Sequence, residues 1–493
     1  MAITAGSNLN SVVASGKQTL ASNYLDLAGT TNEGGAQQYL PDLMEKEAEV
    51  FGPRTISGFL SQVGAEEAMT SDQVVWSEQG RLHLSYIGTV NTGTSVVTIV
   101  TDIYGNALTS THGIRLNDQV LVATAEGTAK CIVTAHSGAT VTCVPYEQEN
   151  LDDLSAFSTE SAAACTVLVY GSEFNKGVEG QGSYGGISAS GPKTVKPSFK
   201  SFTNKPIIMK DYYEISGSDA SQIGWVEVTG EEGQSGYLWY LKAEGDTRAR
   251  FTDYLEMTML EAEKIVSTSV AVDTIFAGAA GLGTNAGTEG LFAAIEDRGN
   301  VTTGITGVNA ATDLAEFDLI LAEFDKQGAI EENMMFVNRS TSLAMDDMLA
   351  SMNSYGAGGT SYGVFNNSEN MALNLGFSGF RRGSYDFYKS DMRYLNDKAT
   401  RGGINDRDAV APIRGVLIPA GVSSVYDQQL GKNLKRPFLH VRYRASQTDD
   451  RRMKTWVTGS VGAATSDLDA MQINYLSERC LITQGANNFM LMK

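Results

Sequence analysis

The sequence has few of the residues that zinc binding or hydrolytic catalysis would require. Its four cysteines form no C-x-x-C pair, and it has only four histidines. It contains no G-x-S-x-G and no H-E-x-x-H motif, and no close pair of carboxylates stands out from the surface acids. We therefore expect no enzyme activity, no cofactor and no metal site.

Long apolar runs and an excess of basic residues are also absent. No stretch of 18 apolar residues occurs, and the first 20 residues lack the basic start and apolar segment of a signal peptide, so we expect a cytoplasmic protein without a membrane partner. The 37 basic residues are outnumbered by 57 acidic ones, giving a net charge of −20. Such a chain repels phosphate, which argues against tight, sequence-reading nucleic-acid binding but leaves loose contact open.

Two of the cysteines, Cys131 and Cys143, suggest a possible cross-link. A three-residue loop at His136-Ser137-Gly138, with Gly138 in the left-handed conformation, would place them opposite each other on a hairpin. Two buried thiols in a reduced protein are the favoured interpretation, and a disulfide is the alternative.

Local patterns divide the first half of the chain. Residues 1–40 are polar and without periodicity, which is typical of an arm, and residues 41–54 have the acids, Pro41 and Gly-Pro stop of a short helix. Short β-branched runs between Gly, Asn and Asp turns predict a small all-β module over about 90–170, either a barrel or a sandwich. A Gly/Ser-rich stretch then leads to an extended segment, SFTNKPIIMKDYYEISG, at 201–217.

A long helix is predicted over 237–266, where apolar or small residues recur at the 3.6-residue period. Its core stripe includes Phe251, Leu255, Met259 and Ala262. Gly245 could bend its first turns. Alternating helix and strand patterns over 272–425 predict an α/β lobe, and residues 426–493 alternate as sheet strands.

The glycine-rich loops are poor candidates for phosphate binding. GLGTNAGTEG at 281–290 lacks the P-loop lysine and the G-x-G-x-x-G spacing, and GAGGTSYG at 356–363 fails in the same way. We interpret both as connections or loop tips.

Basic residues gather mainly near the end of the chain. Arg442 and Arg444 lie on one face of a predicted strand, and Arg381 and Arg382 adjoin a Gly-rich loop. A solvated sheet face is the ordinary interpretation. The functional one is charge pairing with a neighbouring subunit, which we favour, or contact with packaged phosphate. The predicted intersubunit contact residues are Arg381, Arg382, Arg442, Arg444, Lys205 and Lys210.

The order of these elements resembles the major capsid proteins of tailed bacteriophages, which have the HK-ninety-seven-type shell fold. The resemblance extends over nearly the whole chain: an arm, a helix before Gly-Pro, FGPRTISGFLSQVG, the Trp-bearing VVWSEQGRL, the return strand SFTNKPIIMKDYYEISGS and a long helix. It implies an α+β phage major capsid fold. It divides the chain into an N-terminal arm and short helix (1–70), a β E-loop (71–89 and 171–216), an inserted small β-barrel or sandwich (90–170), a peripheral domain with a spine helix (217–274), an α/β axial domain (275–425) and a peripheral sheet segment (426–493).

The resemblance also implies a function and partners. The chain would self-assemble into hexamers and pentamers of an icosahedral shell around double-stranded DNA, touching the DNA without specificity. Portal, scaffold and auxiliary capsid proteins would be further partners, and the location would be a virion capsid assembled in a bacterial cytoplasm. The inserted β module is similar to that of crAss-like phage capsid proteins, and no cross-linking Lys–Asn pair is recognisable. Another phage structural protein, such as a tail tube or decoration protein, and a glycan-binding module in the β insertion are the alternatives.

Overall fold

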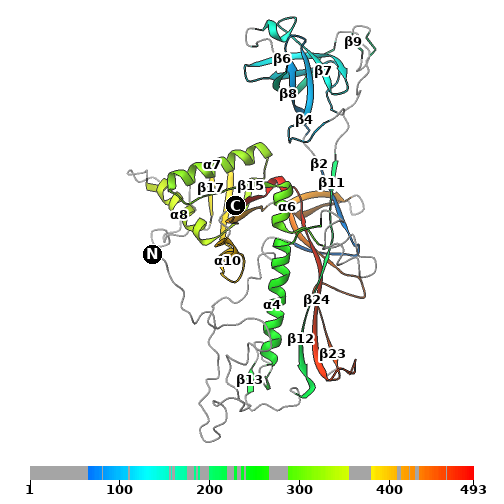
Figure 1. Ribbon diagram of the computed structural model, residues 1–493, viewed down its shortest axis with the longest axis vertical. Coiled ribbons are helices and arrows are strands. Elements are labelled where there is room, and N and C mark those ends of the chain that lie inside the picture. The colour runs from blue at the N-terminus through cyan, green and yellow to red at the C-terminus, as the bar shows by residue number, and fades with distance from the viewer. Residues whose placement is uncertain are drawn as a thin grey trace. The chain divides into compact units, whose positions relative to one another are not determined.

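The computed structural model describes most of the chain after residue 64 (Figure 1). The described residues are 65–79, 82–108, 112–154, 157, 162–174, 183–184, 187–188, 199–218, 227–229, 235–237, 240–265, 287–354, 379–407, 412–420, 422–427, 432–461 and 464–493. The predicted arm at 1–40 and helix at 41–54 lie outside them. The described chain falls into two compact units, a smaller one containing Tyr212–Phe251 and Trp456–Asn474 and a larger one containing the other described residues.

The predicted α+β class is confirmed, and the all-β module is a closed barrel. Its strands are β3 (Ser85–Asn91), β4 (Val96–Asp102), β5 (Asp118–Ala123), β6 (Thr128–Ser137), β7 (Thr140–Pro145) and β8 (Ala163–Ser172), closed in the order β3-β4-β7-β6-β5-β8. Alternate residues of each strand point into one apolar core, which includes Val90, Val97 and Val120, all fully buried. The barrel begins at Ser85, since β3 pairs with both β4 and β8. Residues 85–89, which the sequence assigned to the E-loop range 71–89, are therefore part of β3.

The predicted hairpin around the cysteines has a different register, and the prediction that Cys131 faces Cys143 is wrong. Ser137 pairs with Thr140, which leaves a two-residue turn at 138–139, and the register shifts between Val133 and Ala135. Cys143 is therefore opposite Val133, whereas Cys131 is opposite Pro145. Gly138 does have the left-handed conformation, with φ 59°. All four cysteines are free and buried.

A second sheet has five strands. They are β1 (Ala65–Met69), β22 (Leu439–Arg444), β24 (Ala470–Thr483) and β12 (Ile207–Ser216) in that order, with β23 (Lys454–Gly459) also paired to β24. Strand β1 runs parallel to β22, and β22 runs antiparallel to β24. Residues 475–483 of β24 are all buried.

The long helix α4 spans Tyr240–Glu261, 22 residues, and is shorter than the predicted 237–266. Residues 235–237 instead form strand β14 (Ser235–Tyr237), which pairs with β13 (Glu227–Thr229). Gly245 is exposed and lies inside the helix without interrupting it. The chain leaves the helix at Ala262, whose carbonyl oxygen accepts a hydrogen bond from the Gly290 N–H at 2.7 Å.

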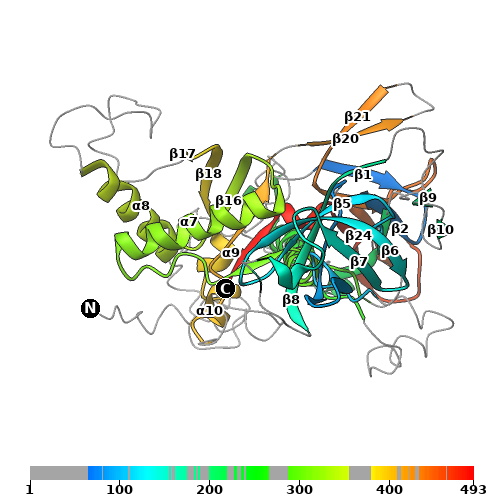
Figure 2. The same ribbon diagram turned by 90° about the horizontal axis from the view of Figure 1, so that it is seen from above.

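The α/β lobe is built on a six-stranded mixed sheet. Its strands are β15 (Asn300–Thr302), β25 (Met490–Met492), β19 (Gly415–Pro419), β16 (Glu332–Val337), β18 (Tyr385–Asp391) and β17 (Gly379–Arg382), in that order. Its helices are α6 (Leu291–Arg298), α7 (Ala310–Gln327), α8 (Arg339–Ser354), α9 (Arg393–Asn396) and α10 (Arg401–Asn405). Helices α7 and α8 pack together on this sheet (Figure 2), with Phe317, Met345 and Phe387 in the shared core.

The lobe also takes in residues from the segment 426–493. Strand β25 pairs with both β15 and β19. Its three apolar residues, Met490, Leu491 and Met492, are fully buried there. The C-terminal residues of this sequence thus belong to the lobe sheet, in contrast to the peripheral sheet expected for them.

Four two-stranded ribbons complete the described strands. Three are β9 (Ser183–Tyr184) with β10 (Ile187–Ser188), β13 with β14, and β20 (Val422–Asp427) with β21 (Lys432–Pro437). The fourth, β2 (Val74–Gln79) with β11 (Phe199–Asn204), brackets the barrel in sequence.

Candidate functional site

The β2–β11 ribbon is a two-stranded element with one face exposed to solvent. Its two antiparallel strands pair from Val74↔Asn204 to Gln79↔Phe199, and the chain passes from the second end into the barrel and back. Within the described residues no third strand joins either strand. One face is covered, since Trp76 is only 7% exposed, whereas Val75 on the other face is 60% exposed. The ribbon therefore presents an exposed apolar side chain, Val75, and two strand edges that pair with no further strand among the described residues.

Asn204 holds the base of the ribbon. Its side chain is fully buried, and its Nδ2 donates to the carbonyl oxygens of Leu481, at 2.6 Å, and Glu289, at 3.0 Å. Its Oδ1 accepts from the Glu289 N–H at 2.9 Å and from the Thr288 hydroxyl at 3.2 Å. One amide thus ties the end of β11 to β24 and to the segment before α6, with both of its polar atoms satisfied.

Glu78 fixes the other strand of the ribbon. One oxygen, Oε1, accepts a hydrogen bond from Trp76 Nε1 at 3.0 Å and another from the Gly485 N–H at 2.9 Å. Gly485 has φ 62°, a left-handed conformation that favours glycine, so the turn after β24 can present its N–H to this carboxylate. The side chain of Glu78 thereby joins β2 to the turn that follows β24.

Arg298, at the end of α6, packs on the covered face of the ribbon. Its guanidinium lies 4.7 Å from the ring centre of Phe202 and 5.6 Å from that of Trp76. It also forms an ion pair with Glu289 at 2.6 Å, and only 10% of the Arg298 side chain is exposed. Burial raises the pKa of Glu289, while Arg298 and Lys264 act in the opposite direction. Lys264 itself donates to the Thr203 carbonyl oxygen at 3.1 Å.

We call Glu78, Asn204, Lys264, Glu289 and Arg298 the ribbon anchor. None of them was singled out from the sequence, because their partners are far apart along the chain: Asn204 and Leu481 are separated by 277 positions. The sequence showed only two separate strand-like segments, one with Trp76 and one with Phe202, and no link between them. The anchor orders the base of the ribbon, while the outer face stays uncovered.

The predicted contact residues on β22 already have partners within the chain. Arg442 pairs with Glu67, the residue opposite it on β1, at 2.8 Å. Arg444 pairs with Asp72 and, at 3.2 Å, with Glu478, whose side chain is 5% exposed. These arginines therefore hold β1 and β24 to β22.

The paired arginines of β17 are also engaged within the lobe. Arg382 contacts Asp318 of α7 at 2.5 Å, and Arg381 lies 3.6 Å from Asp386, its cross-strand neighbour on β18. Arg381 remains 59% exposed.

The two predicted lysines differ in their surroundings. Lys205 directly follows Asn204 in the sequence, and its backbone N–H donates to Asn204 Oδ1 at 2.8 Å. Lys210 is exposed on β12. Of the six predicted contact residues, Arg381 and Lys210 are the two whose side chains are most available to a second molecule.

The predicted core stripe lies mostly on α4. Phe251 is 1% exposed, Leu255 2% and Met259 0%, at a spacing of four residues. Ala262 is half-buried and lies just beyond the helix, at the turn packed against Gly290. These residues serve packing and offer no functional group.

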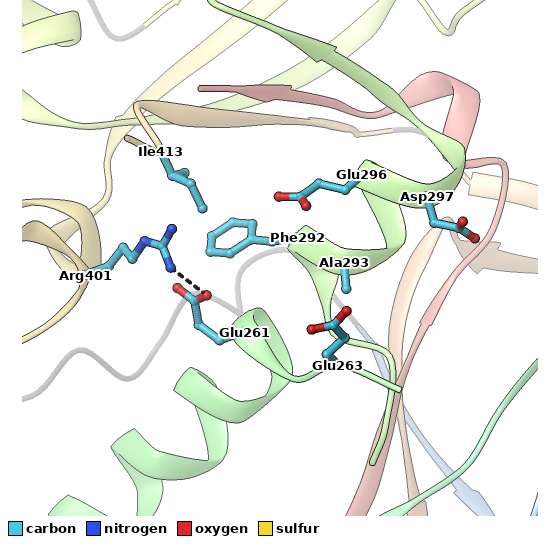
Figure 3. Close-up of a pocket in the computed structure, with 8 residues that line it drawn as sticks. All are labelled: Glu261, Glu263, Phe292, Ala293, Glu296, Asp297, Arg401 and Ile413. Atoms are coloured by element: carbon cyan, nitrogen blue, oxygen red, sulfur yellow. Dashed lines mark hydrogen bonds and ion pairs between the residues drawn. The ribbon is translucent and has the colours of Figure 1, made fainter. Parts of the chain in front are cut away.

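A pocket of about 390 Å³ lies at the end of α4, beside α6 (Figure 3). Glu261, Glu263, Glu296 and Asp297 line it with Arg401, and Arg401 pairs with Glu261 at 3.0 Å. Glu261 also accepts from the Tyr394 hydroxyl, and Glu296 pairs with Lys493. Among the described residues no group of three or more His, Cys, Asp or Glu is arranged to hold a metal ion. Two of the four acidic side chains of the pocket, Glu261 and Glu296, are thus held in ion pairs.

No helix in the described part of the chain has the length and hydropathy needed to cross a membrane.

No protein-family model and no curated protein matches the sequence. Among solved structures, the chain is similar to one from Microbacterium phage Oxtober96, at 8% identity and a TM-score of 0.35, covering 92% of this chain and 95% of that one. It is similar to the capsid of a native GTA particle, at 10% identity and a TM-score of 0.34, covering 93% and 96%. The bacteriophage PhiM1 mature capsid matches at 8% identity and a TM-score of 0.29, covering 64% and 78%.

Proposed function

We propose that this chain is a major capsid protein, a structural subunit that assembles with copies of itself into a viral shell. The observation that carries the proposal is the β2–β11 ribbon, which is anchored at its base and uncovered along its edges and outer face. A two-stranded ribbon is marginally stable by itself in water, and unpaired edges with exposed apolar residues invite pairing with another chain.

A second copy of the chain is the partner that best fits this ribbon. In a ring of identical subunits the interface is head-to-tail, so the β2–β11 ribbon of each copy can dock on a different surface of the next copy, and every copy is satisfied in the same way. The anchor favours such a role, because Asn204 and Arg298 hold the base of the ribbon before any neighbour arrives. The ribbon then loses less conformational entropy when subunits assemble.

The finer assignments follow the resemblance described above. The ribbon corresponds to the E-loop, the barrel to its insertion, α4 to the spine helix and the lobe to the axial domain. The shell would consist of hexamers and pentamers with icosahedral symmetry, assembled in a bacterial cytoplasm with portal, scaffold and auxiliary proteins. The net charge of −20 supports enclosure of DNA without tight binding. Lys205, Lys210 and the four arginines remain proposed contacts between subunits.

Electron microscopy of the full chain tests the proposal. We expect purified protein, or particles that contain it, to show regular shells or capsomers, and Val75→Asp to reduce their yield at least tenfold while the subunit stays folded. Gln73→Asp places the same charge at an exposed polar position just before this strand and should assemble as the unmodified chain does. A homogeneous monomer at high concentration, with no ordered assembly under any solution condition, would contradict the proposal.

A further inference from the structure

The outer wall of the barrel carries a group of exposed aromatic side chains beside polar ones. Tyr146, just after β7, and Tyr170, on β8, are each 48% exposed, and Phe174 is 37% exposed. Large aromatic rings left half in solvent on a small domain often mark a binding surface.

Tyr146 belongs to a hydrogen-bonded set with Gln119 and Glu173. Its hydroxyl donates to Glu173 Oε2 at 2.6 Å, and Gln119 Nε2 donates to the same oxygen at 3.1 Å and to the Tyr146 hydroxyl at 3.0 Å. These hydrogen bonds lower the pKa of Glu173, so its carboxyl group is ionised at neutral pH. The three side chains come from segments 27 and 54 positions apart, and their hydrogen bonds fix them relative to one another.

A β-bulge places Tyr170 beside this set. On β8, Val169 pairs with Val120 and Gly171 pairs with Gln119, so Tyr170 has no opposite residue on β5. Such a bulge turns one side chain away from the regular alternation. Tyr170 is also near enough to Tyr146 to raise its pKa, after the larger effects of burial and of Glu173.

Gly171 leaves room for the amide of Gln119. A β-carbon at Gly171 would lie 2.8 Å from Gln119 Oε1, closer than real contacts allow. Within the described residues, neither Gln119 Oε1 nor Glu173 Oε1 accepts a hydrogen bond. Two acceptors and two aromatic rings thus lie together on one wall.

The charge of the barrel restricts the class of ligand. Residues 85–174 contain nine acidic residues and two basic ones, so phosphate groups are repelled and a nucleic acid is a poor partner. A neutral saccharide fits both features, because its hydroxyls can donate to the two open acceptors while its C–H faces stack on the tyrosine rings.

We infer that Tyr146, Tyr170, Gln119 and Glu173 form a binding site for neutral saccharides on the outer wall of the barrel. The site does not depend on the role proposed for the ribbon. On an assembled particle, a weak site of this kind would be repeated in every copy and would gain avidity from that repetition.

Affinity electrophoresis of the full chain through gels containing dextran, mannan or galactan tests the inference. We expect at least one of these neutral polysaccharides to retard the protein, and Tyr170→Ala or Gln119→Ala to weaken the retardation at least tenfold. Tyr104→Ala is the matched control, since Tyr104 is 54% exposed elsewhere on the barrel, and should leave binding unchanged. Protection of Cys131, Cys143 and Cys165 from alkylation reports that each variant barrel is folded.

Three results would overturn the inference. They are the absence of retardation by all three polysaccharides, equal retardation of the Tyr170→Ala and unmodified proteins, and retardation only in a parallel gel that contains heparin. The first would leave the aromatic wall as a surface for contact with protein, and the last would indicate a charge-driven interaction.

Discussion

The guanidinium of Arg298 lies 4.7 Å from the centre of the Phe202 ring and 2.6 Å from a Glu289 carboxylate oxygen, so one side chain contacts both the ribbon and the segment that holds its base. A planar guanidinium can stack and pair at the same time, which a lysine cannot do.

Arg298→Ala should lower the free energy of unfolding by about 3 kcal/mol, because Glu289 would be left buried without its partner. Arg298→Lys should cost about 1 kcal/mol, since the charge is kept but the stacking is lost. Urea denaturation measures both. Asp297→Ala, at a side chain that is 74% exposed, is the control and should have little effect. A lysine variant as stable as the unmodified protein would show that stacking on Phe202 contributes nothing.

Asn204→Asp should be more destabilising than Asn204→Ala. The alanine leaves the carbonyl oxygens of Glu289 and Leu481 without their donor, at a cost of about 2 kcal/mol. The aspartate would direct an oxygen at the same two carbonyl oxygens and add a buried charge. Thermal unfolding of the two variants provides the measurement, and an aspartate variant as stable as the alanine variant would contradict the assigned orientation of the amide.

Leu255→Asp should abolish soluble, assembly-competent protein. Leu255 is 2% exposed on α4, so a carboxylate there would be buried without a partner, at a cost of more than about 4 kcal/mol. Tyr254→Asp introduces the same charge one position earlier, where the side chain is 44% exposed, and should be tolerated. The yield of soluble protein and of particles distinguishes the two variants. A normal yield from Leu255→Asp would show that Leu255 does not lie on the buried face of the helix.

All four thiols should resist alkylation in the native protein and react after denaturation. Burial raises the pKa of Cys131 to about 12, that of Cys165 to about 11 and that of Cys480 to about 12, and it also raises that of Cys143. Mass spectrometry after iodoacetamide treatment at pH 8 counts the labels. Fewer than four labels in the denatured, non-reduced protein would reveal a disulfide.

His112 should make the barrel sensitive to acid. His112 is 8% exposed, and the centre of its ring lies 4.5 Å from that of His136 and 6.0 Å from that of Tyr86. Burial and, to a smaller extent, His136 lower the pKa of His112 to about 4. The unfolded chain takes up this proton near pH 6.5, so the stability from neutral His112 is complete above that pH. It declines as the pH falls toward 4, by about 3 kcal/mol in total.

The comparison for His112 is between two phenylalanine variants. His112→Phe should melt with less dependence on pH between 6.5 and 4 than the unmodified protein does. His83→Phe, at an exposed ring, should retain the full dependence. Identical pH profiles for all three proteins would exclude His112 as the source.

Local patterns were the part of the fold that could be predicted from the sequence. The β-branched runs between turns predicted the barrel, and the 3.6-residue period placed Phe251, Leu255 and Met259 on one helix face. The register around Cys131 could not be predicted, because the shift between Val133 and Ala135 leaves no trace in the alternation. The anchor was missed for a different reason: an isolated Asn or Arg gives no sign of which distant carbonyl or ring it will meet.

The pairing of Asn204 with Leu481 has a consequence for the order in which the chain matures during synthesis. The barrel depends on neighbouring segments and can fold soon after residue 172 has left the ribosome, whereas the ribbon base stays unfastened until residue 481 has followed. A nascent chain therefore has a folded barrel and an unanchored ribbon from about residue 172 until residue 481 has been added. Only chains synthesised beyond residue 481 therefore have a ribbon whose base is held in place.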